Sequence, residues 1–398
     1  MNGPRVLIII QNLWVPFDRR VWLECQALVA AGYDVTVVCP KGPGDPSYQV
    51  IDTVTVHKYK AYAPGGSKIS FVWEYAYSFL MTLRLVFRAR KAGKFQVLQA
   101  CNPPDIFWPI AILLRALDRT KFVFDHHDLC PELFQSRFGG TASLPYKGLR
   151  FLERMTHRTA DHVTSTNDSY RKIAITRSGK ANHDVTVVRT GPDPEKLHRD
   201  PQSADESLRR GHKYLVTYIG VMGPQDGVDI VVRAADHIVN TLGRTDIAFT
   251  LMGGGDSFDE VVALRDELGL QEHVEFTGRV PDETVRAVMS TADAGLSPDP
   301  KNPLNDVSTM NKTMEYMAFE LPVVAFDLVE TRVSAQEAAV YAEPGRVDRY
   351  ADAVLDLLAD DVRRKQMAAA GRRRVEDVLA WRNQVPAYVG VHDRLTRR

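Results

Sequence analysis

Apolar residues in this chain form short continuous runs that alternate with stretches of helical spacing. Residues 5–10 form one run, residues 21–31 repeat apolar positions at helical spacing up to Gly32, and residues 34–39 form the next run. A continuous apolar run predicts a strand that is buried on both faces of a parallel sheet. The order strand, loop, helix, strand therefore predicts the start of a doubly wound α/β domain.

The pattern starts a second time at Tyr214, where an apolar run leads into a glycine-bearing loop and a helical stretch over 228–242. Between the two halves, residues 191–211 are rich in charge and proline and poor in apolar residues, which is typical of a domain boundary. The predicted organisation has an N-terminal domain (1–190), a linker (191–212), a C-terminal domain (213–378) and a terminal segment (379–398).

The stretch from Asn305 to Asp327 predicts a loop, a helix, a sharp stop and a buried strand. Ser308 or Thr309 is expected to cap the helix, because a hydroxyl accepts hydrogen bonds from the free backbone N–H groups of a first turn. Pro322 is expected to end the helix.

Lys312 and Glu315 share one face of this predicted helix, because residues three apart are neighbours on a helix surface. A helix N-terminus with a lysine beside it attracts phosphate, and a carboxylate one turn deeper can accept hydrogen bonds from a diol. Together they fit a nucleotide whose diphosphate lies at the helix tip and whose ribose hydroxyls meet Glu315. An ordinary surface Lys–Glu pair is the alternative.

The composition narrows the class of protein. Fifty basic and fifty acidic residues cancel over 398 residues, so nothing favours a nucleic-acid partner. Cys25, Cys39, Cys101 and Cys130 have no metal-ligand spacing and are expected to be buried residues of a reducing compartment. The N-terminus shows no secretory cleavage pattern, and the longest apolar run, 106–114, is too short to span a bilayer. A cytoplasmic location is therefore expected.

Residues 69–94 combine an aromatic first part with a basic end. A helix of this kind can lie in a membrane interface, which makes peripheral contact with the inner face of a membrane an expectation. The alternative is a buried helix whose cations sit near its C-terminal end, where the macrodipole favours them.

Three loops that follow predicted strands are further site candidates, since ligands bind at the carboxyl ends of parallel strands. Arg19 and Arg20 follow the first strand and either meet an anion or form a solvated basic turn. His127 follows the strand at 121–124 and either faces a cleft as a polar contact or is satisfied in the core. The glycine run 253–255 lets the backbone approach a ligand, or forms a plain turn.

On these residues the chain resembles family 4 of the retaining glycosyltransferases over nearly its whole length. The most specific likeness is Met314-Glu315-Tyr316-Met317-Ala318 followed by Pro322-Val323-Val324. The other matching segments are 5–39, 125–132, 160–165, Gly220 with Gly227, and the run at Gly253. The resemblance implies the GT-B fold, in which two Rossmann-like doubly wound α/β domains face each other across a cleft. It also implies that the second domain binds a nucleotide-sugar donor and the first an acceptor, and that the segment around Trp381 crosses back to the first domain.

The resemblance also implies roles for individual residues. Glu315 matches the glutamate that holds the ribose, His127 matches the histidine that reaches the transferred sugar, and 253–255 match a loop near the base or phosphates. The donor-side residues are expected to be Gly220, Gly253, Gly254, Gly255, Asp306, Ser308, Asn311, Lys312 and Glu315. The acceptor or diphosphate side is expected to include Asp18, Arg19 and Arg20.

Several departures from the family pattern concern charge. Val307 stands where the family has its first paired glutamate, with Asp306 or Asn305 as a replacement contact to the sugar. Val221 and Asp226 stand where the family has an arginine and a lysine that meet the diphosphate. We therefore expect Lys312 to take the diphosphate role, with Arg19 or Arg20 assisting on domain closure. No Asp-x-Asp pair occurs in the sequence, so no metal and no other cofactor is expected.

The expected function is that of a retaining, metal-independent glycosyltransferase. It would move a sugar from a nucleoside-diphosphate sugar to a hydroxyl acceptor, a sugar or a lipid-linked sugar, in surface polysaccharide or glycolipid assembly. One alternative is a degenerate, non-catalytic protein that binds a sugar nucleotide or a partner. Another is a sugar-nucleotide epimerase. The sequence indicates neither the sugar nor the base.

Overall fold

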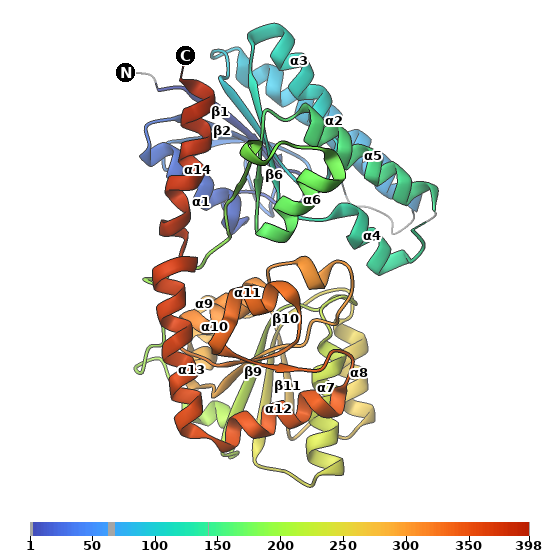
Figure 1. Cartoon of the computed structure of the whole chain (residues 1–398), viewed down its shortest axis with the longest axis vertical. Helices are drawn as coiled ribbons and strands as arrows, with labels where there is room; N and C mark the ends of the chain where they lie inside the picture. The colour runs from blue at the N-terminus through green and yellow to red at the C-terminus, as the bar shows by residue number, and fades with distance from the viewer. Residues whose placement is uncertain (1–2, 63–67, 142, 398) are drawn as a thin grey trace. The chain divides into compact units, whose positions relative to one another are not determined.

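The computed structural model describes residues 3–62, 68–141 and 143–397, without the side chains of 68–72 and 137. The chain forms two compact units (Figure 1). Unit 1 comprises Met1–Arg189 together with Gln384–Arg398, and unit 2 comprises Thr190–Asn383.

Unit 1 is built around an eight-stranded sheet with the order β3-β4-β2-β1-β5-β6-β7-β8. Neighbouring strands pair in parallel except β3 and β4, which form an antiparallel hairpin at one edge. The strands are β1 (Arg5–Ile9), β2 (Asp34–Pro40), β3 (Tyr48–Ile51), β4 (Val54–Tyr59), β5 (Val97–Cys101), β6 (Lys121–His126), β7 (His162–Ser165) and β8 (Val185–Val187).

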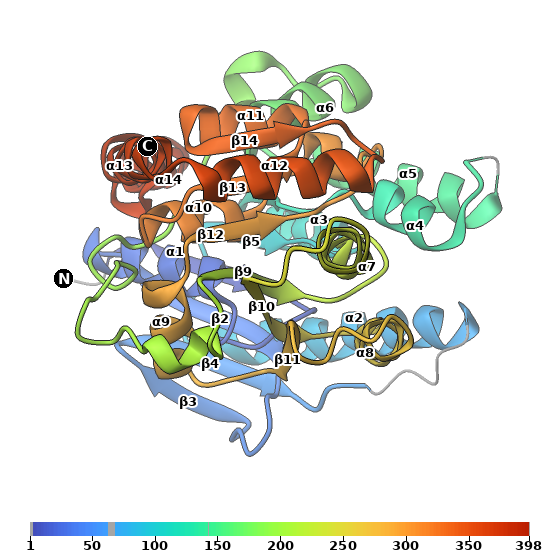
Figure 2. The same cartoon turned by 90° about the horizontal axis from the view of Figure 1, so that it is seen from below.

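Helices cover both faces of this sheet. Crossover connections between parallel strands are right-handed, so a connection that runs towards one edge of the sheet places its helix on one face, and a connection towards the other edge places its helix on the opposite face. The step from β1 to β2 places α1 on one face, beside α14, while α2, α3, α5 and α6 lie on the other (Figure 1, Figure 2). The helices are α1 (Arg19–Ala30), α2 (Lys68–Arg90), α3 (Trp108–Asp118), α4 (Cys130–Phe138), α5 (Leu144–Thr159), α6 (Asp168–Ser178) and α14 (Trp381–Thr396).

Unit 2 contains a six-stranded parallel sheet with the order β11-β10-β9-β12-β13-β14. One apolar cluster packs α7, α8 and α12 on one face, and a second packs α9 and α10 on the other. The strands are β9 (Tyr214–Val221), β10 (Ile247–Gly254), β11 (Val274–Gly278), β12 (Ala294–Ser297), β13 (Val323–Phe326) and β14 (Ala339–Ala342). The helices are α7 (Val228–Asp236), α8 (Phe258–Glu267), α9 (Asp282–Thr291), α10 (Asn311–Ala318), α11 (Val329–Ala335), α12 (Val347–Ala359) and α13 (Asp361–Arg374).

The predicted α/β class with two doubly wound sheets is confirmed. The four cysteines are free and buried, as expected. Among the described residues, no helix combines the length and the apolar content needed to cross a bilayer.

Helix α10 ends at Ala318, ahead of Pro322, and a turn formed by residues 316–321 closes it. The N–H of Glu320 donates to the carbonyl of Met317 at 3.1 Å, and the N–H of Leu321 donates to that of Tyr316 at 2.9 Å. This double turn-back is the Schellman pattern, which usually has glycine at the position of Glu320. Glu320 has a φ of 57°, in the left-handed region that a side chain disfavours.

Replacing Glu320 by glycine should therefore stabilise unit 2. The substitution relieves a left-handed conformation that costs an L-residue about 1 kcal/mol, and the free energy of unfolding should rise by that order in chemical denaturation. Glu320→Ala is the matched control, because it removes the charge but keeps the Cβ. A gain from alanine as large as that from glycine would show that charge, not backbone conformation, is responsible.

Candidate functional site

The donor-side residues predicted from the sequence lie in unit 2, around the carboxyl ends of three neighbouring strands, β10, β9 and β12, and the start of α10 (Figure 1). Asn305 ties two of these loops together. Its Nδ2 donates to the carbonyls of Gln225 and Pro300, both at 2.9 Å. The loop after β9 and the loop after β12 are thereby held beside the segment that precedes α10.

Lys312 is largely buried between two carboxylates. Its Nζ donates to Oδ1 of Asp299 at 2.6 Å and lies 4.0 Å from Oδ1 of Asp226. It also lies 5.1 Å from the centroid of the Tyr218 ring. Burial acts to lower the pKa of Lys312, but Asp299 and Asp226 outweigh it and raise that pKa above its ordinary value. The ammonium is therefore charged and already paired with Asp299.

Glu315 lies one turn further along α10 and is partly exposed. The next residue, Tyr316, fixes the rotation of the helix. Its hydroxyl donates to the carbonyl of Leu296 at 3.0 Å and accepts from the N–H of Ile219 at 2.9 Å. A Cβ on Gly295 would lie only 2.3 Å from the Tyr316 ring, so that glycine is required for the ring to fit. The buried tyrosine thus determines which face of α10 carries Glu315.

The three consecutive glycines at the end of β10 differ in whether a side chain would fit at their positions. A Cβ on Gly253, whose φ is 132°, would lie 1.9 Å from the carbonyl oxygen of Gly220. A Cβ on Gly255 would lie 2.7 Å from that of Met222. A Cβ on Gly254 would meet nothing within 4 Å. The packing of the strand ends therefore explains the first and third glycines but leaves Gly254 unexplained.

The N-terminus of α10 carries no side-chain cap and no acidic residue in its first turn. The cap position is Met310, and the Oγ of Ser308 donates to the carbonyl of Leu304 at 2.7 Å. The prediction that Ser308 or Thr309 caps this helix is therefore wrong. Asn311, the first helical residue, is exposed. An uncapped first turn leaves backbone N–H groups available to an anion.

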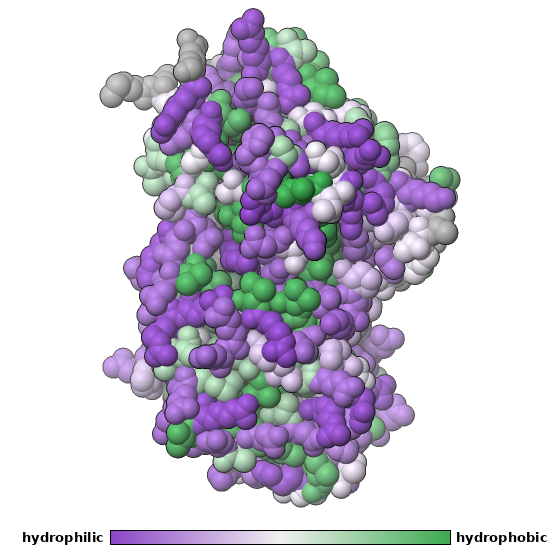
Figure 3. Space-filling model, viewed as in Figure 1, coloured by the Kyte–Doolittle hydropathy of each residue, from purple (hydrophilic) through white to green (hydrophobic). Residues whose placement is uncertain are grey.

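Asp306 stabilises the start of α11. Its Oδ1 accepts from the N–H of Val329 at 3.0 Å and lies 3.5 Å from Nζ of Lys301. Helix α11 exposes Val329 and Val333. Figure 3 shows a hydrophobic area over this helix. A sugar contact from Asp306 or from the buried Asn305, in place of a glutamate at position 307, stays a prediction.

In unit 1, His127 follows β6 in a loop held by Asn102. The N–H groups of His127 and Asp128 both donate to Oδ1 of Asn102, at 2.8 and 3.0 Å. The Nδ1 of His127 lies 3.8 Å from Asp125. Its Nε2 is buried without a hydrogen-bond partner among the described residues. Sequence reasoning missed Asn102, and its only signal is the proline pair 103–104 that follows it.

Arg20 lies inside unit 1 and does not face an anion site. Its Nε and Nη2 donate to Asp125 at 3.0 and 2.6 Å, and its Nη1 donates to the carbonyl of Val188 at 3.0 Å. Burial acts to raise the pKa of Asp125, but Arg20 and His127 outweigh it and hold that pKa below its ordinary value. The interpretation of Arg20 as a diphosphate contact is wrong, because its guanidinium is used within the core.

The other two residues predicted for the acceptor or diphosphate side, Asp18 and Arg19, differ in exposure. Asp18 is buried and caps α1, since its Oδ1 accepts from the N–H of Val21 at 2.9 Å. Arg19 is exposed at the first position of α1. Of the three, Arg19 alone lies where a ligand could reach its side chain.

One buried group of potential metal ligands occurs in the described part of unit 1: Glu24, Cys101 and Asp125, with ligand atoms within 4.8 Å of one another. Arg20 already contacts both carboxylates, at 3.2 Å from Glu24 and 2.6 Å from Asp125. Burial also raises the pKa of the Cys101 thiol. A metal ion would have to displace the guanidinium, so this group does not fit a metal site.

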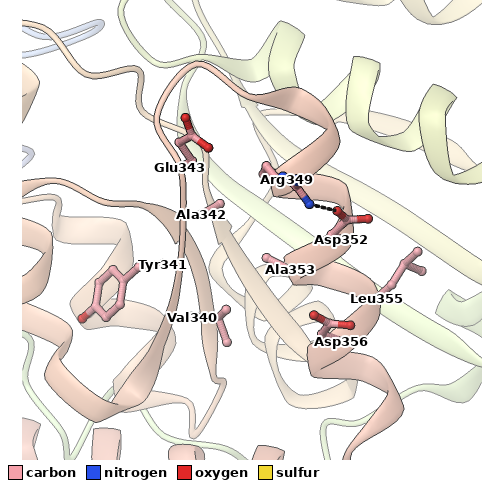
Figure 4. A pocket seen from close by; sticks show the side chains of 9 residues that line it. All are labelled: Val340, Tyr341, Ala342, Glu343, Arg349, Asp352, Ala353, Leu355 and Asp356. Carbon is pink, nitrogen blue, oxygen red and sulfur yellow. Dashed lines mark hydrogen bonds and ion pairs between the residues drawn. The ribbon is translucent and has the colours of Figure 1, made fainter.

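A depression of about 530 Å³ lies elsewhere on unit 2, between the end of β14 and α12 (Figure 4). Its walls carry Glu343, Asp352 and Asp356, and the one arginine, Arg349, pairs with Asp352 at 3.3 Å. None of the predicted donor-side residues lines it. Its excess of carboxylates would repel a diphosphate, so we do not assign the donor to it.

Comparison with known proteins identifies the family. The model of Glycosyltransferase Family 4 matches residues 18–196, and the model of group 1 glycosyl transferases matches residues 213–360. The chain belongs to the family 4 glycosyltransferases. The resemblance stated from the sequence is confirmed, and the enzyme class is glycosyltransferase.

One relative of this glycosyltransferase is the GDP-mannose-dependent α-(1-6)-phosphatidylinositol monomannoside mannosyltransferase of Mycobacterium tuberculosis. It is 26% identical over 307 residues, which are 74% of this chain and 68% of the relative. Sucrose-phosphate synthase from Thermosynechococcus elongatus has a TM-score of 0.80 at 17% identity, over 98% of this chain and 99% of that one. Anabaena HepE, solved with UDP and glucose, has a TM-score of 0.72 at 14% identity, over 99% of this chain and 100% of that one. These structures show the GT-B fold.

The glycine run generates a test of the donor side. Gly254→Ala should change the free energy of unfolding by less than about 0.5 kcal/mol, yet weaken binding of a nucleoside diphosphate by roughly tenfold. Gly253→Ala should instead cost about 2 kcal/mol or more of stability, because its Cβ meets a backbone carbonyl. Binding that is unchanged in a stable Gly254→Ala protein would remove this loop from the donor side.

Asp105 is hydrogen-bonded to Asn102, the residue that holds the loop of His127. The ionisation of Asp105 should make the stability of unit 1 depend on pH. This buried carboxyl accepts from Asn102 at 3.2 Å, and its other oxygen has no partner in the described part of the chain. Burial, followed by the charge of Glu153, raises the pKa of Asp105 to about 8. Between the unfolded pKa and that value the folded state binds the extra proton, so stability falls as pH rises towards 8.

Asp105→Asn should flatten this part of the pH dependence, as measured by thermal unfolding from mildly acidic pH up to about pH 8. Asp168→Asn, at an exposed carboxylate of α6, is the control and should leave the slope unchanged. An undiminished slope in Asp105→Asn would assign the effect to another group.

Proposed function

We propose that this protein is a retaining, metal-independent glycosyltransferase that moves a sugar from a nucleoside-diphosphate sugar to a hydroxyl acceptor. The observation that carries the proposal is the tip of α10. An uncapped helix start, a paired lysine and a carboxylate one turn deeper stand beside the glycine-bearing ends of β9 and β10.

The chemistry follows from what each group can stabilise. The N–H groups of Asn311 and Lys312, at the start of α10, would donate hydrogen bonds to the diphosphate, whose charge grows as the sugar leaves. Glu315 would accept hydrogen bonds from the ribose hydroxyls and so position the donor. Gly254 would allow the strand end to approach the nucleotide. His127 of unit 1 would meet the transferred sugar, as the family resemblance implies. Retention of configuration is what the family resemblance implies.

Lys312 can serve the diphosphate only under a condition that the sequence did not reveal. Its ammonium is already held by Asp299 at 2.6 Å, so the donor must share it with, or take it from, that carboxylate. Asp299→Asn should therefore tighten binding of a nucleoside diphosphate, because it removes the competitor. Lys312→Met should weaken it by roughly tenfold or more.

Tighter nucleoside-diphosphate binding in Asp299→Asn together with weaker binding in Lys312→Met is the result that supports this role for Lys312. The paired Lys312→Met/Asp299→Asn protein is the control for general damage to the site, since it removes both charges of the pair. If Lys312→Met keeps wild-type turnover and affinity, Lys312 has no part in donor binding.

The acceptor is proposed to be a sugar or lipid-linked sugar of a surface polysaccharide or glycolipid. The names of related enzymes support this, since the Mycobacterium tuberculosis relative uses GDP-mannose and a phosphatidylinositol mannoside. UDP and GDP sugars are accordingly the donors to test first.

A thermal-shift panel of UDP, GDP, ADP and their common sugars, each with and without magnesium, tests the donor site. A ligand that binds only the folded state raises its stability with the logarithm of its concentration over Kd. We expect a shift with one base, equal with and without magnesium, that is lost in Glu315→Ala. Glu343→Ala, in the acidic depression, should retain it.

The alternatives have their own outcomes. No shift with any nucleotide at saturation would favour a degenerate binding protein. A shift that appears only with magnesium would contradict the metal-independent mechanism. With donor alone, release of free nucleoside diphosphate supports a transferase, whereas formation of a new sugar nucleotide would favour an epimerase.

A further inference from the structure

Helices α2, α3 and α5 make up one side of unit 1, on the sheet face opposite α1 and α14 (Figure 1, Figure 2). The inner sides of α2 and α3 join one apolar cluster with the sheet, and α5 packs against α3 and β6. Apart from the contacts of α5 with α4 and α6, no element of the described residues covers the outward sides of these helices, which we call the outer helical surface. Their composition therefore indicates what this side of the protein meets.

The carboxylates of α2 to α5 are withdrawn from the outer helical surface. Each of the four helices has one acid in its sequence: Glu74, Asp118, Glu132 and Glu153. Glu74 accepts from Gln11 at 3.0 Å, Asp118 pairs with Arg90, and Glu132 and Glu153 both pair with Arg177. None of the four is classed as exposed.

The cations, in contrast, point outward. The exposed basic residues of this surface are Arg84, Arg88, Arg119, Lys147, Arg154 and Arg158. The last three lie on α5, and they form no ion pair within the described residues. In a chain with fifty basic and fifty acidic residues, α2, α3 and α5 thus expose cations and no fully exposed carboxylate, while the neighbouring α6 carries the exposed Asp168.

Large apolar side chains lie among these cations. The exposed ones are Trp73, Leu80, Ile112, Leu113, Leu117, Leu144 and Phe151. Leu144 is 82% exposed and Trp73 is 65% exposed, so most of each side chain lies outside the core of unit 1. On α5, Leu144, Phe151 and Arg158 are seven residues apart in turn, so they share one helix face.

From this arrangement we infer that the outer helical surface binds the interface of a bilayer that contains anionic lipid. The lysine and arginine side chains meet the headgroup charge, and the apolar side chains enter the boundary with the acyl chains. Membrane contact was expected from the sequence through residues 69–94 alone. The structure adds α3 and above all α5, whose sequence had not drawn attention. The inference stands on unit 1 and does not depend on the donor chemistry proposed for unit 2.

Charge complementarity favours a lipid surface over the other occupants of such a face. A second copy of the same cationic surface would repel the first. A nucleic acid would not need Leu144 or Phe151, which carry no charge or polar group. An anionic lipid surface is satisfied by both kinds of side chain.

Co-sedimentation of the full chain with vesicles tests the inference. Wild-type protein should partition onto vesicles of equal parts phosphatidylglycerol and phosphatidylcholine, less at raised ionic strength, and far less onto phosphatidylcholine alone. Each lysine or arginine near an anionic surface raises the membrane partition coefficient about fivefold. The α5 variant Lys147→Gln/Arg154→Gln/Arg158→Gln should therefore bind roughly 100-fold more weakly.

A matched control carries three substitutions on an exposed basic helix of unit 2, Arg363→Gln/Lys365→Gln/Arg373→Gln on α13. It should partition like the wild type. A second variant, Leu144→Ser/Phe151→Ser, keeps every charge and should also weaken binding. Circular dichroism and thermal unfolding establish that each variant is folded.

Three results would overturn the inference. One is a wild type that does not partition onto anionic vesicles. Another is a loss of vesicle binding in the α13 variant that equals the loss in the α5 variant, which would show that the attraction depends on charge but not on this surface. The third is a wild type that sediments as a dimer while the Leu144→Ser/Phe151→Ser variant sediments as a monomer. This result would make the outer helical surface an interface between copies of the chain.

Discussion

The ion pair between Lys312 and Asp299 is the interaction on which the donor side of unit 2 depends. It joins the start of α10 to the loop after β12, and Asp226 extends it to the loop after β9. A buried charge is tolerated only when it is paired, and removal of one partner typically costs about 3–5 kcal/mol. The three segments that would surround a donor are therefore held by one shared charge cluster. Tyr316 then sets the rotation of α10 within that frame.

The same cluster gives physical meaning to the departures from the family pattern. The resemblance implies a lysine at position 226, where this chain has aspartate, and the positive charge is instead on Lys312. A cation thus remains beside the strand ends, but it comes from the helix and not from the loop. The cost is a second carboxylate nearby, so donor binding is a competition for one ammonium group. Unit 1 shows the related principle in its core, where Arg20 holds Asp125 beneath the loop of His127.

Continuous apolar runs predicted the parallel strands well, because strands buried on both faces have little choice of residue. Helix ends were predicted less well. Ser308 was a reasonable cap by residue type, yet its hydroxyl bonds to Leu304, and Glu320 occupies a turn position that usually has glycine. The β3–β4 hairpin and α13 were not predicted, since neither has a pattern that stands out locally.

Charged site residues were the least predictable, because the partner of a charge is chosen by the fold. Arg19 and Arg20 are adjacent and alike in sequence, but one is exposed and the other is bonded to Asp125 in the core. Lys312 was placed correctly on α10, while Asp299, which holds it, gave no signal of its own. Asn102 was missed for the same reason, since its contacts with residues 127 and 128 span a separation that no local pattern records.

Hydrogen exchange of the backbone amides, measured with and without a saturating nucleoside diphosphate, tests the central claim most directly. If the tip of α10 receives the diphosphate, the amides of Asn311, Lys312 and Gly254 should be protected on binding, because their N–H groups lie at the proposed contact. Unchanged exchange at these amides, with protection only around the depression at 340–356, would contradict the account.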